Sequence, residues 1–202
     1  MRRNTFFFVL LLFYLTPAVF AASPNYYVNI GMTKPFAPET FNTDWRSGFN
    51  LGAGLGFNVS PKFEIQGEIL YDYLQLDDNS FLTDIADNMA YASVSGGETS
   101  ILTASANLKY FSPIGEEARA TPFLVGTFGF ASKVIREKKI NTEESSFTEP
   151  KVTENVPAVG AGLGLEIEMG ENTYFVVEGR FNVLFTEETT VYLPLKLGIV
   201  IR

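Results

Sequence analysis

Residues 48–60 read GFNLGAGLGFNVS, and residues 62–76 read KFEIQGEILYDYLQL. In both stretches nearly every second residue is apolar, and most residues between them are glycine, polar or charged. This period of two predicts a β-strand with one apolar face. Each stretch is about a dozen residues long, which exceeds the about 5–6 residues of an ordinary soluble strand. The length is close to the roughly 9–11 residues that a tilted strand needs to cross a bilayer.

The same alternation returns along the rest of the chain. The predicted strands are 25–32, 48–60, 62–76, 99–111, 122–132, 156–169, 173–185 and 189–201. The connections differ in length and alternate along the chain. Residues 33–47, 77–97 and 133–154 form long polar loops, 112–121 an intermediate connection, and 60–62, 170–172 and 186–189 short ones. Long loops at one end and short turns at the other are typical of an outer-membrane barrel. The predicted fold is all-β: an eight-stranded antiparallel up-and-down transmembrane β-barrel.

The two faces of the strands differ in bulk and in charge. One face is rich in Phe, Leu and Ile, and the other carries glycine, amides and a few charges. Eight strands leave an interior just wide enough for side chains, so the bulky face should point to lipid and the polar face to the lumen. The facing of 122–132 stays undecided. The aromatic residues expected to face lipid are Phe63, Tyr71, Tyr73, Phe175, Phe181 and Phe185.

Glycines recur on the polar face of two strands, in LGAGLGF (51–57) and VGAGLGL (159–165). If Val59 faces Phe63 across the first turn, Gly54 lies opposite Glu68. If Met169 faces Thr173, Gly162 lies opposite Arg180. Glycine leaves room for a long side chain on the neighbouring strand. The lumen glycines are Gly52, Gly54, Gly56, Gly160, Gly162 and Gly164.

These positions predict an ion-pair network that fills the lumen. Its expected members are Glu64, Glu68, Lys109, Glu166, Glu178, Arg180 and Lys196. An isolated buried charge is costly, so pairing is expected. The alternative is a carboxylate pair in acid–base catalysis, but the nearby bases and the lack of His favour a structural salt-bridge plug.

Composition restricts the possible functions further. The chain has 202 residues, no Cys and no His, and a net charge of −8. Without Cys there is no disulfide and no thiolate nucleophile, and without His no Ser-His-Asp triad. The acidic balance argues against nucleic-acid binding. We expect no catalytic residues, no cofactor and no metal site.

The first residues have the features of a secretory signal peptide. Arg2 and Arg3 precede an apolar run from Phe6 to Leu15, and Ala21 provides a small residue at a cleavage site. The run is shorter than the roughly 20 apolar residues of a membrane-spanning helix. We expect residues 1–21 to be removed on export and residues 22–202 to form one outer-membrane β-barrel domain.

The alternating strands, the hairpin SPKFEIQGEILYDYL (60–74) and the closing strand VYLPLKLGIVIR (191–202) resemble the small outer-membrane barrels of the OmpA transmembrane domain, OmpX and OmpW type. The resemblance covers nearly all of residues 23–202. It implies a monomer in the Gram-negative outer membrane, in contact with membrane lipid and lipopolysaccharide and inserted by the barrel assembly machinery. Such barrels usually end on an aromatic residue, whereas this chain ends on Arg202.

Three functions remain open at this point. The leading hypothesis is a non-enzymatic barrel that anchors long extracellular loops for surface interaction or adhesion with a host or environmental ligand, as the resemblance to OmpX implies. The first alternative is a narrow OmpW-like channel for small solutes, which would need an apolar lumen. The second is a secreted lipocalin-like carrier. Lipid-modifying barrels of this size use a catalytic His, which this chain lacks.

Overall fold

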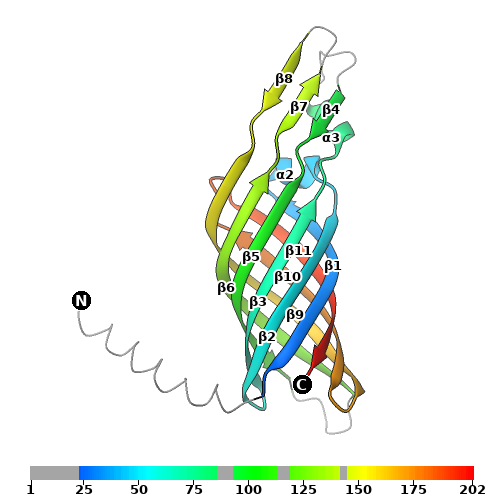
Figure 1. The fold of residues 1–202 in the computed structure, drawn as a ribbon, viewed down its shortest axis with the longest axis vertical. Coiled ribbons are helices and arrows are strands. Elements are labelled where there is room, and N and C mark those ends of the chain that lie inside the picture. The colour runs from blue at the N-terminus through cyan, green and yellow to red at the C-terminus, as the bar shows by residue number, and fades with distance from the viewer. Residues whose placement is uncertain (1–22, 86–92, 113–118, 142–144) are drawn as a thin grey trace, which may run out of the picture.

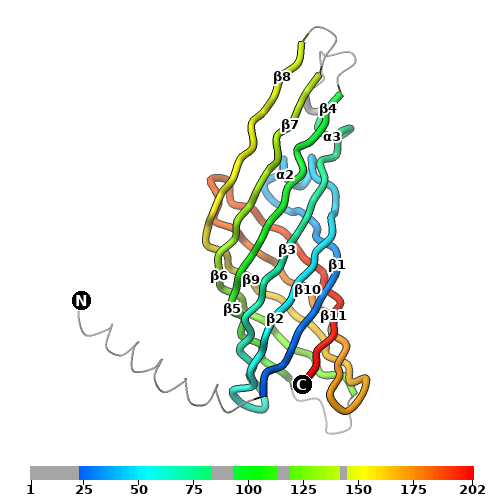
Figure 2. The backbone as a smooth tube through the Cα atoms, viewed as in Figure 1, coloured from blue at the N-terminus to red at the C-terminus, as the bar shows by residue number. Residues whose placement is uncertain are grey.

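The computed structural model describes the chain except residues 1–22, 86–92, 113–118 and 142–144. The predicted signal peptide therefore lies outside the described residues. The main body is a closed antiparallel barrel with the strand order β1-β11-β10-β9-β6-β5-β3-β2 (Figure 1). Strands β1 and β11 close it, so the first and last strands lie side by side (Figure 2). The predicted eight-stranded barrel is confirmed. Within the described residues, no helix is long and apolar enough to cross a membrane.

The barrel strands follow the predicted segments closely. They are β1 (Asn25–Ala37), β2 (Gly48–Ser60), β3 (Phe63–Leu74), β5 (Thr99–Phe111), β6 (Ala120–Ile135), β9 (Val152–Gly170), β10 (Thr173–Leu184) and β11 (Thr190–Ile201). Three strands are longer than expected. β1 continues five residues past Met32, and β6 and β9 extend into the region expected to be a polar loop.

The predicted registers inside the two glycine-rich hairpins are confirmed. Gly54 lies opposite Glu68, and Gly162 lies opposite Arg180. The pairing assumed at the turns is wrong, because Phe63 pairs with Ser60 and Thr173 pairs with Gly170. An irregularity of one residue beside each turn absorbs the difference.

The long loops contain structure that the sequence pattern did not predict. Helix α2 (Glu39–Asp44) lies above the barrel mouth, and α3 (Asp78–Ile85) follows β3. Three short strands, β4 (Ser93–Gly96), β7 (Lys138–Asn141) and β8 (Ser146–Glu149), form a separate sheet. This sheet continues the direction of β5, β6 and β9 beyond the barrel rim (Figure 1). β7 and β8 pair as a hairpin between β6 and β9, where a polar loop was expected, and β4 from another loop is the third strand of the sheet.

Two apolar clusters lie at the two ends of the lumen. The cluster at the long-loop end consists of Phe41, Leu74, Ile101, Ala131, Ala158, Leu184 and Tyr192. The cluster toward the short-turn end consists of Tyr27, Phe123, Val125, Val176 and Val200. The charged residues lie between and beside them. The lumen is thus a packed core with an apolar layer at each end.

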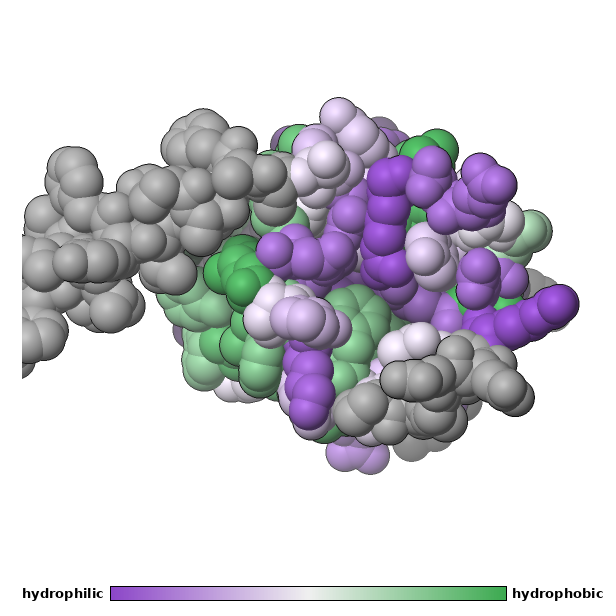
Figure 3. Space-filling model, turned by 90° about the horizontal axis from the view of Figure 1, so that it is seen from below, coloured by the Kyte–Doolittle hydropathy of each residue, from purple (hydrophilic) through white to green (hydrophobic). Residues whose placement is uncertain are grey.

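The outer wall is apolar, as predicted. Leu124, Phe128 and Phe130 are exposed, which settles the facing of β6. Of the six aromatic residues expected on this wall, Phe63, Phe181 and Phe185 are exposed, and Tyr71, Tyr73 and Phe175 are partly exposed. Seen from the short-turn end, hydrophilic residues gather over the end of the barrel and hydrophobic residues appear at its flank (Figure 3).

Candidate functional site in the lumen and at the long-loop end

Four charged side chains form a closed ring in the middle of the lumen. The Arg180 guanidinium lies 2.7 Å from Glu68 and 2.5 Å from Glu178, measured between Nη2 and the nearest carboxylate oxygen. Lys196 Nζ lies 2.7 Å from Glu68 and 2.9 Å from Glu178. Glu68 comes from β3 on one side of the barrel, and its partners come from β10 and β11. The ring therefore ties opposite walls together with two positive and two negative charges.

Neutral groups complete the hydrogen bonding of the ring. Asn107 Nδ2 donates to Glu68 at 3.0 Å, and Arg180 Nη1 donates to Asn107 Oδ1 at 3.1 Å and to Thr127 Oγ1 at 2.8 Å. All four ring side chains are nearly fully buried. A buried charge is tolerated when it is paired and hydrogen-bonded, and the ring meets both conditions.

A second cluster lies nearer the short-turn end. Lys109 and Glu64 face each other across β5 and β3, with 3.7 Å between Nζ and Oε1. Lys109 also lies 4.0 Å from the centre of the Tyr27 ring, and the Tyr27 hydroxyl donates to Glu64. The carboxylate of Glu166 accepts from Arg202. This cluster also balances, with Lys109 and Arg202 against Glu64 and Glu166.

The structure places all seven predicted charged residues inside the barrel, but in two clusters instead of one. Glu68, Glu178, Arg180 and Lys196 form the ring, and Glu64, Lys109 and Glu166 belong to the second cluster. Sequence reasoning missed Tyr27, Asn107 and Arg202. Arg202 stands where such barrels usually have a terminal aromatic residue, and its side chain turns inward, with Cζ 4.2 Å from the centre of the Tyr174 ring. Tyr27 and Asn107 each lie between two residues of the outer face of their strands, and this alternation could have identified both as lumen residues.

The lumen glycines leave room for their neighbours, though not always for the residue directly opposite. A Cβ on Gly56 would lie 2.7 Å from the Glu64 carboxyl, and one on Gly54 would lie 3.0 Å from Gln66. A Cβ on Gly164 would meet the Phe123 ring at 2.3 Å. The remaining three, Gly52, Gly160 and Gly162, would meet Asn29, Asn182 and the backbone of Gly179. The six glycines are thus needed to let side chains fill the lumen.

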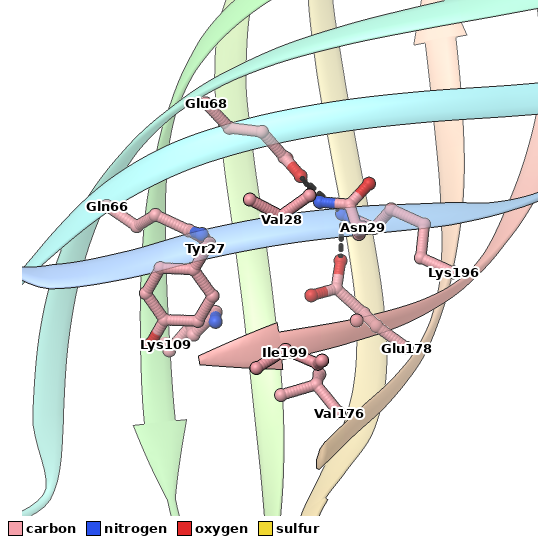
Figure 4. A pocket seen from close by; sticks show the side chains of 11 residues that line it. Tyr27, Val28, Asn29, Gln66, Glu68, Lys109, Val176, Glu178, Lys196 and Ile199 are labelled. Atoms are coloured by element: carbon pink, nitrogen blue, oxygen red, sulfur yellow. Dashed lines mark hydrogen bonds and ion pairs between the residues drawn. The ribbon is translucent and has the colours of Figure 1, made fainter. Parts of the chain in front are cut away.

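A cavity of about 10 Å³ lies between the ring and the second cluster. Tyr27 and Lys109 lie on one side of it, and Lys196 and Glu178 on the other (Figure 4). A volume of this size is about that of one water molecule. The ion pairs connect opposite sides of the barrel wall, and the cavity between them is too small for a solute. Among the described residues, no group of three or more acidic side chains is arranged to hold a metal ion.

The sheet beyond the rim has its own small core. Leu76, Phe81, Val94 and Ile140 are buried together, with Trp45 packed against them. Trp45 Nε1 donates to the carbonyl of Gly97 at 3.2 Å. Gly96 and Gly97 have φ values of 86° and 79°, in the region that favours glycine. These contacts fasten α3 and the small sheet to the barrel.

An ion pair outside the membrane holds the start of α3. Arg46 Nη2 lies 2.8 Å from Asp77 Oδ1, and the same oxygen accepts from the backbone N–H of Asn79. The hydrogen bond from Arg46 lowers the pKa of Asp77 from 3.8 to about 2, and the backbone N–H groups of Ser80 and Asn79 contribute. The same contact raises the pKa of Arg46.

The sequence profile described as "Outer membrane protein beta-barrel domain" matches residues 6–193. This chain belongs to that family. A search of curated proteins finds no match. The family places the barrel in the outer membrane and agrees with the apolar surface of its wall.

Solved structures give the same fold at low sequence identity. Neisserial surface protein A is similar with a TM-score of 0.59 and 10% identity, over 89% of this chain and 97% of that one. A major outer membrane protein from Thermus thermophilus has a TM-score of 0.54 and 12% identity, over 89% of this chain and 99% of that one. At these identities the likeness shows the fold alone.

Proposed function

We propose that this chain is a non-enzymatic outer-membrane anchor whose long-loop end contacts other surfaces. The observation that carries the proposal is the small sheet of β4, β7 and β8, which extends the wall past the rim and has a core of its own. A barrel that only occupied the membrane would have no use for a second core outside it. Barrels of this family carry their longer loops on the outside of the cell, so the sheet would project from the cell surface.

One edge of this projection supports binding to a protein. β9 pairs with β10 only from Ala158 onward, so residues 152–156 and β8 have no strand partner on that side within the described residues. An unpaired edge offers backbone donors and acceptors to a strand of another chain. Phe147 on β8 is 60% exposed and adds an apolar contact beside that edge.

The balanced lumen supports the non-enzymatic assignment. The carboxylates of Glu68 and Glu178 are each held by both Arg180 and Lys196, so neither is free to serve as a general base. The channel alternative would need the ring to open, since the cavity beside it holds about one water molecule. Membership of the outer-membrane family disfavours the secreted carrier.

The remaining partners are also proposals. The exposed rows of Leu, Ile and Phe on the wall suit membrane lipid and the acyl chains of lipopolysaccharide. The barrel assembly machinery would insert the chain after removal of residues 1–21, and the closed barrel would act as a monomer. The surface ligand would come from a host cell or from the environment, and it would meet the sheet.

Adhesion of intact cells tests this proposal. The variant replaces residues 137–150 with an Asn-Gly turn, which keeps β6 and β9 in the barrel and removes β7 and β8. A matched control replaces only Glu171 and Asn172 in the turn at the opposite end. Cells of a Gram-negative strain without other adhesins are allowed to settle on polystyrene and on an epithelial monolayer. We expect the loop variant to lose retention on one of them while the control keeps it. Equal retention, on both surfaces, of the strains that carry the unmodified protein, the loop variant and the control would contradict the proposal.

A further inference from the structure

A cleft of about 500 Å³ opens at the long-loop end, beside α2. Its volume lies within the range of small-molecule sites, about 300–1,000 Å³. The tops of β6 and β9 and the connection between β10 and β11 form its other sides. The lining residues on which the inference depends are Phe41, Trp45, Lys133, Glu154 and Glu188. Because α2 and the apolar cluster below it close the lumen, the cleft ends inside the mouth.

Lys133 and Glu154 lie opposite each other in the β6–β9 register, yet they form no ion pair. The Lys133 ammonium donates instead to Thr190 Oγ1 at 2.9 Å. Glu154 Oε1 accepts from the backbone N–H of Glu187 at 3.3 Å. Two opposite charges that could neutralise each other are therefore held apart at the edge of a cleft.

The Lys133 ammonium is the unusual group of this pair. The residue is only 7% exposed, and within the described residues no carboxylate lies within 4.0 Å of it. Its other contact is with the face of the Phe41 ring, 5.0 Å from the ring centre. Burying an ammonium without an anion is costly. The other buried lysines of the lumen, Lys109 and Lys196, each have a carboxylate partner. The missing partner of Lys133 therefore indicates that an anionic group enters the cleft.

The surroundings narrow the class of ligand. Glu154 and Glu188 bring negative charge to the same cleft and act on Lys133 from a distance, so a simple anion would be repelled on entry. A molecule with both charges would suit each side. Phe41 and Trp45, whose ring centres are 5.5 Å apart, form an aromatic wall for an apolar group.

We propose that this cleft binds a small zwitterion, an α-amino acid or short peptide with an apolar side chain. Its carboxylate would accept from Lys133, its ammonium would donate to Glu154, and its side chain would lie against Phe41 and Trp45. The site goes beyond the surface-contact function, because it needs neither β7 nor β8. A failure of cell adhesion and a failure of this binding can therefore be told apart.

Trp45 provides the measurement, because it is the single tryptophan of the chain and it lines the cleft. The folded mature protein in detergent is titrated with L-leucine while tryptophan fluorescence is followed. Two matched probes each lack one charge: 4-methylpentanoate has no ammonium, and isoamylamine has no carboxylate. We expect a saturable change with L-leucine in the millimolar range or below, and binding at least about tenfold weaker for both probes, since each loses a charge-assisted hydrogen bond.

Two variants test the assigned charges. Lys133→Met and Glu154→Gln should each weaken L-leucine binding by about tenfold or more. Lys62→Met and Glu171→Gln, which change exposed residues in the short turns at the opposite end of the barrel, should leave it unchanged. A closed barrel resists detergent until it is heated, so the folded protein migrates differently on a detergent gel before and after boiling. This gel shift verifies that each variant is folded. If Lys133→Met does not fold, the Glu154→Gln variant and the two singly charged probes test the proposed site.

Three results would overturn the proposal. The first is no saturable response to L-leucine, which would mean that Lys133 and Glu154 neutralise each other in solution. The second is equal binding of L-leucine and of either singly charged probe. The third is unchanged affinity in a folded Lys133 or Glu154 variant.

Discussion

At the centre of the barrel, Arg180 contacts four side chains at once. They are Glu68, Glu178, Asn107 and Thr127. Arg180→Ala would leave two buried carboxylates with Lys196 as their single cation. We expect a loss of about 3–5 kcal/mol in the free energy of unfolding, the cost of breaking a buried pair. Urea titration followed by the gel shift measures it. Arg136→Ala, at an exposed position, should change stability by less than about 0.5 kcal/mol, and equal stability of both variants would contradict the role of the ring.

Gly162 and Gly67 differ in the space that surrounds them, so they test whether the lumen glycines are needed to avoid a steric clash. A Cβ on Gly162 would lie 2.3 Å from the Gly179 carbonyl oxygen, whereas a Cβ on Gly67 would have nothing within 4 Å. Gly162→Ala should destabilise by about 1–3 kcal/mol, as overpacking does. Gly67→Ala should be neutral or slightly stabilising, since it lowers the entropy of the unfolded chain. Thermal unfolding in detergent compares the two, and a neutral Gly162→Ala would show that the lumen has spare room.

Sequence reasoning reached the buried charges because alternation in a strand has a fixed period. Once the outer face was known, Glu68 and Arg180 had to point inward. The division into two clusters could not be predicted in the same way. It depends on which side chains meet across the lumen, and strand pairing fixes only neighbours along the wall. The contact of Arg202 with Glu166 is of this kind.

Among the elements, β3 belongs to the barrel wall, whereas β8 belongs to the small sheet beyond the rim. Ile69 on β3 is 59% exposed on the outer wall, and Phe147 on β8 is 60% exposed beyond the rim. Ile69→Arg should cost about 2–4 kcal/mol if that site lies near the bilayer midplane. Phe147→Arg should cost nearly nothing, because water surrounds the new charge. The free energies are measured in lipid vesicles. Similar values for the two variants would mean that β3 does not face lipid at this height.

The start of α3 should respond to acid. The pKa of Asp77 is lowered to about 2 by Arg46 and by backbone N–H groups. A lowered carboxyl pKa stabilises the folded element above the ordinary value of 3.8, and this contribution is lost as the pH falls toward 2. The protection of the α3 amides from hydrogen exchange, measured against the unfolded chain at the same pH, should therefore fall between these pH values. Asp77→Asn should abolish the pH dependence of this protection, and an unchanged protection profile in this variant would assign the acid response to another group.

The long strands were predictable and the short elements were not. β2 and β5 have the boundaries that their alternation gave, because about a dozen residues of one period leave little ambiguity. α2 has six residues and a single large apolar side chain, Phe41, so no helical period can be read from it. β4, β7 and β8 have four residues each, and their pairing joins two separate loops.

For the whole molecule, the layers of the lumen form a continuous plug. The apolar cluster at the long-loop end comes first along the axis, the ring follows, and the second charged cluster lies among the apolar residues toward the short-turn end. Opposite charges balance within each charged cluster, so neither cluster attracts ions into the barrel. The molecule should therefore be an anchor closed to solutes, with its interactions at the long-loop end.

Conductance in a planar lipid bilayer tests this account most directly. The refolded mature protein is added at moderate salt and recorded at steady voltage, with the Arg180→Ala variant beside it. The plugged barrel should show no large steady current, because an eight-stranded barrel has no water-filled bore. The variant should show more frequent brief openings, since one link of the ring is missing. A stable, porin-sized current from the unmodified protein would contradict the plug and make the channel the leading function.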